Sequence, residues 1–97
     1  MRITLPATVE ERAKALRTGD LLYIRNKAGA ISHVVLWVGS IGAGQDGAAT
    51  HLVLDSHGEG EKDDNGALIP VGVRLRPYRQ GEWYHKSASH AIRLIAD

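Results

Sequence analysis

The residues of this sequence best suited to acid–base chemistry lie in two segments rich in apolar and β-branched side chains. Residues 31–38 carry His33, and residues 51–57 carry Asp55 and His57. Segments of this composition favour β-strands. If the two strands pair as a hairpin, His33 lies opposite or diagonal to Asp55 on the neighbouring strand. An imidazole beside a carboxylate is the base-and-orienter part of a nucleophilic triad, in which the carboxylate fixes the tautomer and the ring accepts a proton.

Strand alternation sorts the side chains of the second segment into an apolar set and a polar set. Leu52 and Leu54 point to one face, which we expect to be the core face. The opposite face carries His51, Val53, Asp55 and His57. These residues also have a simpler interpretation, because strand histidines are more often structural than catalytic, and Asp55 is close enough to Gly58 to cap the following loop.

A metal site is an alternative use of the same polar row. Imidazole and carboxylate groups suit zinc and similar ions, with His33 as a further ligand. However, His51 and Asp55 are four residues apart in the sequence. They would be about 13 Å apart along an extended strand and could not share one ion without a bend. The acidic segment 59–66 lacks the closing bidentate glutamate of a calcium loop. We therefore expect no metal ion and no other cofactor.

The sequence lacks a nucleophile to match this base. It contains no cysteine, and therefore no thiol and no thiolate metal ligand. Ser32 and Ser56 each adjoin a histidine. Neighbours on a regular strand point to opposite faces, so neither serine can pair with its adjoining histidine as nucleophile and base.

Three further residues are candidate substrate contacts. Arg74 and Arg76 share one face of a later strand. Guanidinium groups bind carboxylates through paired hydrogen bonds, although an ordinary solvated strand face is the simpler explanation. Trp37 lies on the same strand face as His33 and is the third candidate.

A short helix and about five strands must position these side chains. Thr8 and Glu11 form a capping-box pattern at the start of the helix, and Gly19 supplies its left-handed stop. The Gly-rich segment 39–50 is expected to be a long hairpin loop, and residues 79–89 are expected to be mostly loop. The segments expected to form strands are 21–25, 31–38, 51–57, 71–75 and 90–95.

The predicted fold is α+β and mainly β, with the short N-terminal helix followed by a roughly five-stranded antiparallel sheet or partly open barrel. A sheet presents two faces, and we expect this chain to cover only one of them. The length of 97 residues predicts a single domain, 1–97, and a hydrophobic content of 43% suits a folded chain.

Charge and hydropathy exclude two classes of partner. The net charge of +1, from 12 basic and 11 acidic residues, argues against a nucleic-acid binder that works through bulk electrostatics. No apolar run approaches membrane-spanning length. The first residues lack the apolar core of a signal peptide, so no targeting segment is expected and the localisation stays open.

Three segments resemble the β-half of NlpC-type (new lipoprotein C) cell-wall cysteine peptidases, which have a papain-like fold. Residues 16–22, LRTGDLL, resemble the family's Leu-x-Pro-Gly-Asp-Leu segment. Residues 32–39, SHVVLWVG, resemble its Ser-His-Val-Gly-Ile-Tyr-x-Gly strand, whose histidine is the catalytic base. Residues 52–56, LVLDS, resemble the next strand, which ends in the third polar residue of the triad.

The resemblance implies that His33 is the general base and Asp55 its orienter, with His57 as the alternative third triad residue. It also implies a peptidoglycan stem peptide or a similar peptide as substrate, and activity at the cell envelope. The chain departs from the family at Thr18, where proline is usual, at Val35, where glycine is usual, and at Asp55, where His, Asn or Gln is usual. The family's Asp-Cys-Ser-Gly motif is absent.

The leading prediction is a partial NlpC-type cysteine peptidase or amidase domain that is inactive alone because it lacks the nucleophilic cysteine. Its implied partners are a Cys-bearing N-terminal half or a second copy of the chain. One alternative is a non-catalytic module that binds cell-wall peptides or a protein. The other is a small metal-binding β-barrel hydrolase. Whether the chain by itself is an enzyme is left open.

Overall fold

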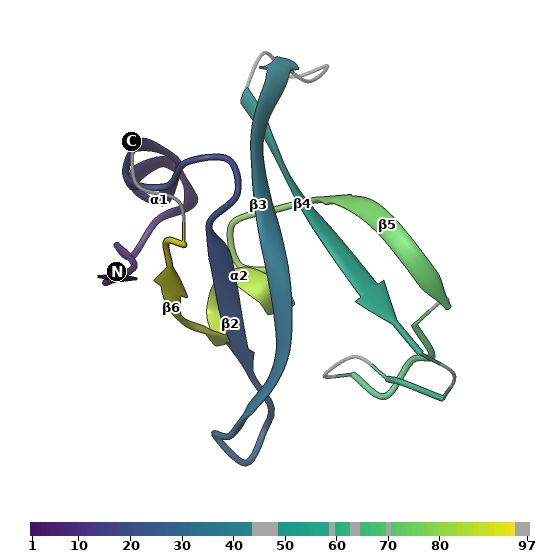
Figure 1. The fold of residues 1–97 in the computed structure, drawn as a ribbon. Coiled ribbons are helices and arrows are strands. Elements are labelled where there is room, and N and C mark those ends of the chain that lie inside the picture. Colours follow the sequence, from purple (N-terminus) through teal and green to yellow (C-terminus); the bar gives the residue numbers. More distant parts are fainter. Residues whose placement is uncertain (44–48, 59, 63–64, 70, 95–97) are drawn as a thin grey trace.

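The computed structural model describes residues 1–43, 49–58, 60–62, 65–69 and 71–94 (Figure 1). Its strands form one antiparallel sheet in the order β1-β6-β2-β3-β4-β5. The elements along the chain are β1 (Arg2–Ile3), α1 (Val9–Ala15), β2 (Leu21–Arg25), β3 (Ile31–Ala43), β4 (Ala49–His57), β5 (Gly72–Pro77), α2 (Trp83–Ser87) and β6 (Ala88–Ile92). The predicted mainly β fold with an N-terminal helix is confirmed, and its sheet of six strands is open.

Helix α1 begins as its sequence predicts and ends earlier. The Glu11 N–H donates to Thr8 Oγ1 at 3.1 Å, and the Thr8 hydroxyl donates to the Glu11 carboxylate at 2.9 Å. The predicted stop at Gly19 is wrong, because Leu16 is already extended, with φ −91° and ψ 150°. Gly19, with φ of 101°, instead forms the turn into β2.

The central hairpin is longer than predicted. β3 and β4 extend into the segment expected to be a loop, of which residues 44–48 lie outside the described part of the chain. The pairing accommodates the glycines through register shifts between Trp37 and Gly39 and between Ser40 and Ala43. Gly39 has a φ of 104°, a conformation that favours glycine.

Short elements were missed or misplaced. Residues 79–89 were expected to be loop, yet they contain α2 and the start of β6. The two-residue strand β1, which pairs with β6, was not predicted. β6 itself ends at Ile92, and position 95 of the expected last strand lies outside the described residues. Elements this short depend on tertiary contacts more than on local sequence preference.

The polar row of β4 faces the core, which reverses the prediction for Leu52 and Leu54. Val53, Asp55 and His57 are buried, whereas the two leucines are half-buried on the other face. The reason is that α2 lies behind the sheet on the Asp55 side (Figure 1). Its side chains, with α1 and the end of β5, cover that face. The buried hydrophobic cluster there comprises Val9, Leu16, Leu22, Ile24, Val35, Trp37, Val53, Tyr78, Tyr84 and Ala91.

The opposite face of the sheet is apolar, and the described residues leave it uncovered. This agrees with the prediction that the chain covers only one face of its sheet. Across β3, β4 and β5, the register aligns Leu36 with Leu54 and Leu54 with Leu75. Leu75 is 58% exposed and Val73 is 67% exposed. Among the described residues, neither helix is long and apolar enough to cross a membrane.

The Gly-Asp-Leu segment joins three elements. The Gly19 N–H donates to the Trp37 carbonyl at 2.9 Å, and the Trp37 N–H donates to the Asp20 carbonyl at 2.8 Å. The buried Asp20 carboxylate accepts two hydrogen bonds from Arg93, at 3.0 and 2.8 Å, and one from the Arg17 N–H at 2.8 Å. This motif therefore ties the turn after α1 to β3 and to the chain following β6.

Candidate functional site

A cluster of ionisable side chains lies on the covered face of β3 and β4. Trp37 pairs with Val53, and continuing this antiparallel register places His33 across from His57. The two imidazole rings are stacked, with centroids 4.3 Å apart and an interplanar angle of 19°. Tyr84 of α2 approaches the same cluster, its ring 5.7 Å from that of His33. The three residues predicted to form a site are thus on one face and close together.

Asp55 is the centre of the hydrogen bonding in this cluster. Its Oδ2 atom accepts from the Tyr84 hydroxyl at 2.6 Å, from His57 Nε2 at 3.0 Å and from the Arg76 guanidinium at 3.3 Å. Burial raises the pKa of the carboxyl, but the bonds from Tyr84, His57 and Arg76 outweigh it, so the pKa lies below its ordinary value. Asp55 therefore carries a negative charge inside the fold at neutral pH.

Asp55 orients His57 and not His33, which differs from the sequence-based pairing. His57 Nε2 lies 3.0 Å from the Asp55 carboxylate and 2.7 Å from the Tyr84 hydroxyl oxygen. Because the Tyr84 hydroxyl donates to Asp55, Nε2 of His57 must carry a hydrogen to serve these two acceptors. The physical reason for the difference is proximity along the strand: His57 lies two residues from Asp55 on the same face of β4, whereas His33 belongs to the neighbouring strand β3.

His33 has a free nitrogen beside this buried pair. Its Nε2 atom is buried and has no hydrogen-bond partner among the described residues. Burial and the neighbouring His57 lower the pKa of His33, against the opposing effect of Asp55. The ring is therefore a neutral proton acceptor at pH 7, and the negative charge of Asp55 is close enough to favour the imidazolium when it forms.

A pocket of about 540 Å³ opens beside the two stacked histidines. His33 and His57 both line it, although His33 Nε2 and His57 Nδ1 are themselves buried. The side chains that line it include Ser32, His33, His57, Glu61, Lys62, Ile69 and Trp83.

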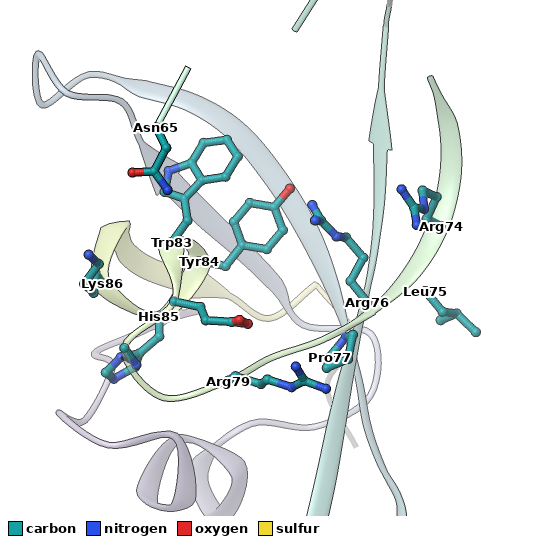
Figure 2. A pocket seen from close by; sticks show the side chains of 12 residues that line it. Asn65, Arg74, Leu75, Arg76, Pro77, Arg79, Trp83, Tyr84, His85 and Lys86 are labelled. Atoms are coloured by element: carbon teal, nitrogen blue, oxygen red, sulfur yellow. Dashed lines mark hydrogen bonds between the residues drawn. The ribbon is translucent and has the colours of Figure 1, made fainter. Parts of the chain in front are cut away.

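A second pocket, of about 570 Å³, lies between β5 and α2 (Figure 2). Arg74 and Arg76, both predicted as substrate contacts, line it, and Figure 2 shows Leu75 between them pointing away. Arg79 and Lys86 add positive charge to the same pocket. Arg76 is also tied to the first cluster, because it donates to Asp55, and its guanidinium carbon lies 5.6 Å from the Tyr84 ring centroid.

Trp37 does not belong to either pocket. Only 2% of its surface is exposed, and its ring packs edge-on against Tyr78, with centroids 5.3 Å apart, and stacks on His51 at 5.7 Å. The prediction that Trp37 contacts substrate is therefore corrected: it is a core residue. His51 packs against it and stands apart from the His33–His57 group.

Sequence reasoning missed two residues of the cluster. Tyr84 lies 29 residues after Asp55 in a short helix that was expected to be loop. Glu61 follows His57 by four residues, across Gly58 and Gly60, and its carboxylate accepts the Gly58 N–H. The His-Gly-x-Gly-Glu spacing was visible in the sequence and indicates a turn that brings a carboxylate back to the histidine. Glu59, Asp63 and Asp64 of the same acidic segment lie outside the described residues.

Comparisons of the chain with models of protein families, with curated proteins and with solved structures found no match. The likeness to NlpC-type peptidases accordingly rests on the three sequence motifs.

Proposed function

We propose that this chain is the histidine-bearing part of an NlpC-type cysteine peptidase or amidase, whose complete domain cleaves amide bonds in peptidoglycan stem peptides or similar peptides. The observation that carries the proposal is the unpartnered Nε2 of His33, held at a pocket beside the buried Asp55–His57 pair. A neutral imidazole with a free lone pair, next to an ionised carboxylate system, is what a thiol nucleophile requires as its base.

In this proposal His33 moves protons between the nucleophile and the amide. It accepts the thiol proton as sulfur attacks the amide carbonyl, and then donates that proton to the leaving amine. The resulting thioester is hydrolysed by water, which gives its proton to His33 during attack; the proton returns to the sulfur as the acid is released. Asp55 and His57 are positioning residues: Asp55 holds the ring on which His33 stacks, and its negative charge favours the imidazolium of His33, whereas the neighbouring His57 opposes it.

The substrate side of the proposal rests on the basic pocket between β5 and α2. Arg74 and Arg76 present guanidinium groups to it, and stem peptides carry carboxylates that such groups bind. Arg76 contacts both the pocket and Asp55, so an anion bound there lies next to the cluster.

The nucleophile must come from another polypeptide segment, because the chain has no cysteine. In this proposal the thiol approaches through the pocket lined by His33 and His57, and the His33 ring turns its buried Nε2 toward that pocket. The implied source is a Cys-bearing N-terminal half, encoded in frame upstream or as a separate protein. Such a segment should begin a helix with a cysteine, since a helix N-terminus favours the thiolate.

The test reconstitutes this arrangement. The chain is combined with the candidate Cys-bearing segment, and release of amines from muropeptides is followed by mass spectrometry. The combination should be active and the chain alone inactive, and His33→Ala should lower kcat about 10³-fold. His51→Gln is the matched control, because His51 lies on the same strand outside the cluster. Turnover by the chain alone, or turnover that survives His33→Ala, would show the assignment to be wrong.

A second candidate function, a non-catalytic binding module, is favoured by the uncovered apolar face of the sheet. Exposed apolar surface of this kind usually marks an interaction site. A module of this type would bind muropeptides without hydrolysing them. Titration of the chain with a muropeptide, followed by NMR, distinguishes the two: shifts at Val73 and Leu75 of the open face, with no turnover once the Cys-bearing segment is added, would favour the module.

A further inference from the structure

The turn after β4 brings the Glu61 carboxylate to the Nδ1 side of the buried His57 ring. His57 Nε2 donates to Asp55 and to the Tyr84 oxygen, so in the neutral ring Nδ1 is a bare acceptor. Nδ1 is buried and has no hydrogen-bond partner among the described residues. Yet Glu61 Oε2 lies 3.5 Å from it. Two acceptors at this distance repel each other unless a positive species lies between them.

We propose that His33, His57 and Glu61 form a binding site for one divalent transition-metal ion of the zinc class. Each residue offers one ligand atom, and these three atoms lie within 4.8 Å of one another. Two imidazoles and one carboxylate form a ligand set that zinc accepts, with a fourth position left for water. Here the fourth position opens to the 540 Å³ pocket that all three residues line.

The distances require only a small closure of the site around an ion. Zinc bonds of about 2.0–2.2 Å in a tetrahedron place ligand atoms about 3.4 Å apart. The His57–Glu61 separation of 3.5 Å already matches this spacing. His33 is half-buried and the Glu61 side chain is 43% exposed, so both can move, whereas His57 is held in place. The parallel stacking of the two imidazoles must open for His33 to aim at the same ion.

The surroundings of His57 are those of a supported metal ligand. A histidine that ligates a metal through one nitrogen usually donates from the other to a carboxylate, which fixes the ring and makes it a better ligand. Asp55 fills this role, with Tyr84 and Arg76 bonded to the same oxygen atom. The sequence-based expectation of no metal weighed His51, Asp55 and His57 with His33 as zinc ligands, and considered Glu61 only as part of a calcium loop, so it did not meet this arrangement.

This inference does not rest on the proposed amide hydrolysis. A metal ion bound by His33 would occupy the lone pair that the hydrolase uses as its base, so the two uses of the cluster exclude each other at any one moment. Metal binding is measured on the chain alone, whereas hydrolysis is measured with the Cys-bearing segment, and either can fail without the other.

The test is titration of the purified chain with Zn²⁺ by calorimetry, and with Co²⁺ as an optical probe of coordination. We expect one ion per chain with a Kd of about 1 μM or tighter, and a tetrahedral Co²⁺ spectrum. Glu61→Gln and His57→Ala should each weaken binding about 100-fold, and Tyr84→Phe about 10-fold. His51→Gln should bind as the unaltered chain does. Zn²⁺ should also raise the Tm of the chain, and not that of Glu61→Gln, which lies on a partly exposed turn and leaves the core intact.

Three results would overturn the proposal. The first is no saturable binding of Zn²⁺ or Co²⁺ by a chain that is folded by circular dichroism. The second is binding that Glu61→Gln and His57→Ala leave unchanged, which would mark an adventitious ion only. The third is a ¹⁵N NMR spectrum in which both His57 nitrogens are protonated at neutral pH and stay so when Zn²⁺ is added, because a proton would then fill the space between His57 and Glu61.

Discussion

At the scale of single residues, the cluster on β4 concentrates charge where a sheet usually keeps its apolar core. Asp55 is buried and ionised, and it is stabilised by three donors that all meet one of its two carboxylate oxygens. Strand alternation alone predicted that His33, Asp55 and His57 share a face. It did not predict that Asp55 bonds to His57, two residues along its own strand, and not to His33 on the neighbouring strand. Nor could it predict the Tyr84 hydroxyl, which belongs to an element with no clear signal in the sequence.

The Tyr84 hydroxyl should stabilise the fold through its bonds to Asp55 and His57. Tyr84→Phe leaves the ring in place and removes the 2.6 Å donor to a buried carboxylate. We expect the free energy of unfolding to fall by about 2 kcal/mol, measured by urea denaturation. Tyr23→Phe is the matched control. Tyr23 is half-buried, and its ring stacks on His90 on the face of the sheet opposite to Asp55. Removing its hydroxyl should therefore lower the free energy of unfolding by less than about 0.5 kcal/mol. Equal losses in the two variants would contradict this role for Tyr84.

At the scale of elements, long apolar strands were predictable and short elements were not. β2 and the centre of the β3–β4 hairpin follow from β-branched and aromatic composition. Helix α2 has only five residues and no side-chain cap, so it is held by its surroundings. One such contact is the buried Arg12 of α1, which donates to the Tyr78 hydroxyl at 2.7 Å and to the His85 carbonyl at 2.8 Å. Contacts between elements distant in sequence leave no local pattern, which is why α2 and β1 were missed.

The junction made by Asp20 predicts a pH-dependent part of the stability. Burial raises the pKa of Asp20, but the bonds from Arg93 and Arg17 outweigh it, so its folded pKa lies below the unfolded one. The stabilisation is therefore fully present above the unfolded value of about 3.9 and is lost as the pH falls toward the folded pKa. Asp20→Asn should lower the free energy of unfolding by about 3 kcal/mol at pH 7, because Arg93 loses its carboxylate.

The difference between the unaltered chain and Asp20→Asn should shrink as urea denaturation is repeated at pH values below about 4. Glu10→Gln supplies the control, because Glu10 is an exposed acid in the first turn of α1. Its free energy of unfolding should stay close to that of the unaltered chain both at pH 7 and below about pH 4. A difference between the Asp20 variant and the unaltered chain that stays constant down to the lowest pH would rule out ionisation of Asp20 as its cause.

At the scale of the whole molecule, the two faces of the sheet differ from those of most sheets that are covered on one side only. Polar groups are buried on the covered face, and apolar side chains are exposed on the open face. The covered face holds the buried polar residues Asp55 and His57, while the open face presents Val34, Val73 and Leu75 to solvent. The sequence predicted that only one face would be covered. Choosing which one required knowing where α2 lies, since Leu52 and Leu54 look more core-like than Asp55. The exposed apolar face is the part of the molecule most suited to contact with another chain.

The open face should make the isolated chain associate with itself at high concentration. Val73 and Leu75 lie on the edge strand β5, where apolar side chains and unpaired backbone groups are exposed together. We expect sedimentation velocity to show the unaltered chain shifting to larger species as its concentration rises, and Val73→Lys with Leu75→Lys to stay monomeric. Both side chains are exposed, so the double variant should lose less than about 1 kcal/mol of stability.

The charge-matched control is Leu68→Lys with Leu94→Lys, which alters two leucines that are each 70% exposed outside the named strands and should still associate. If the control becomes monomeric too, added charge and not the open face governs association, and the face loses its status as a contact surface.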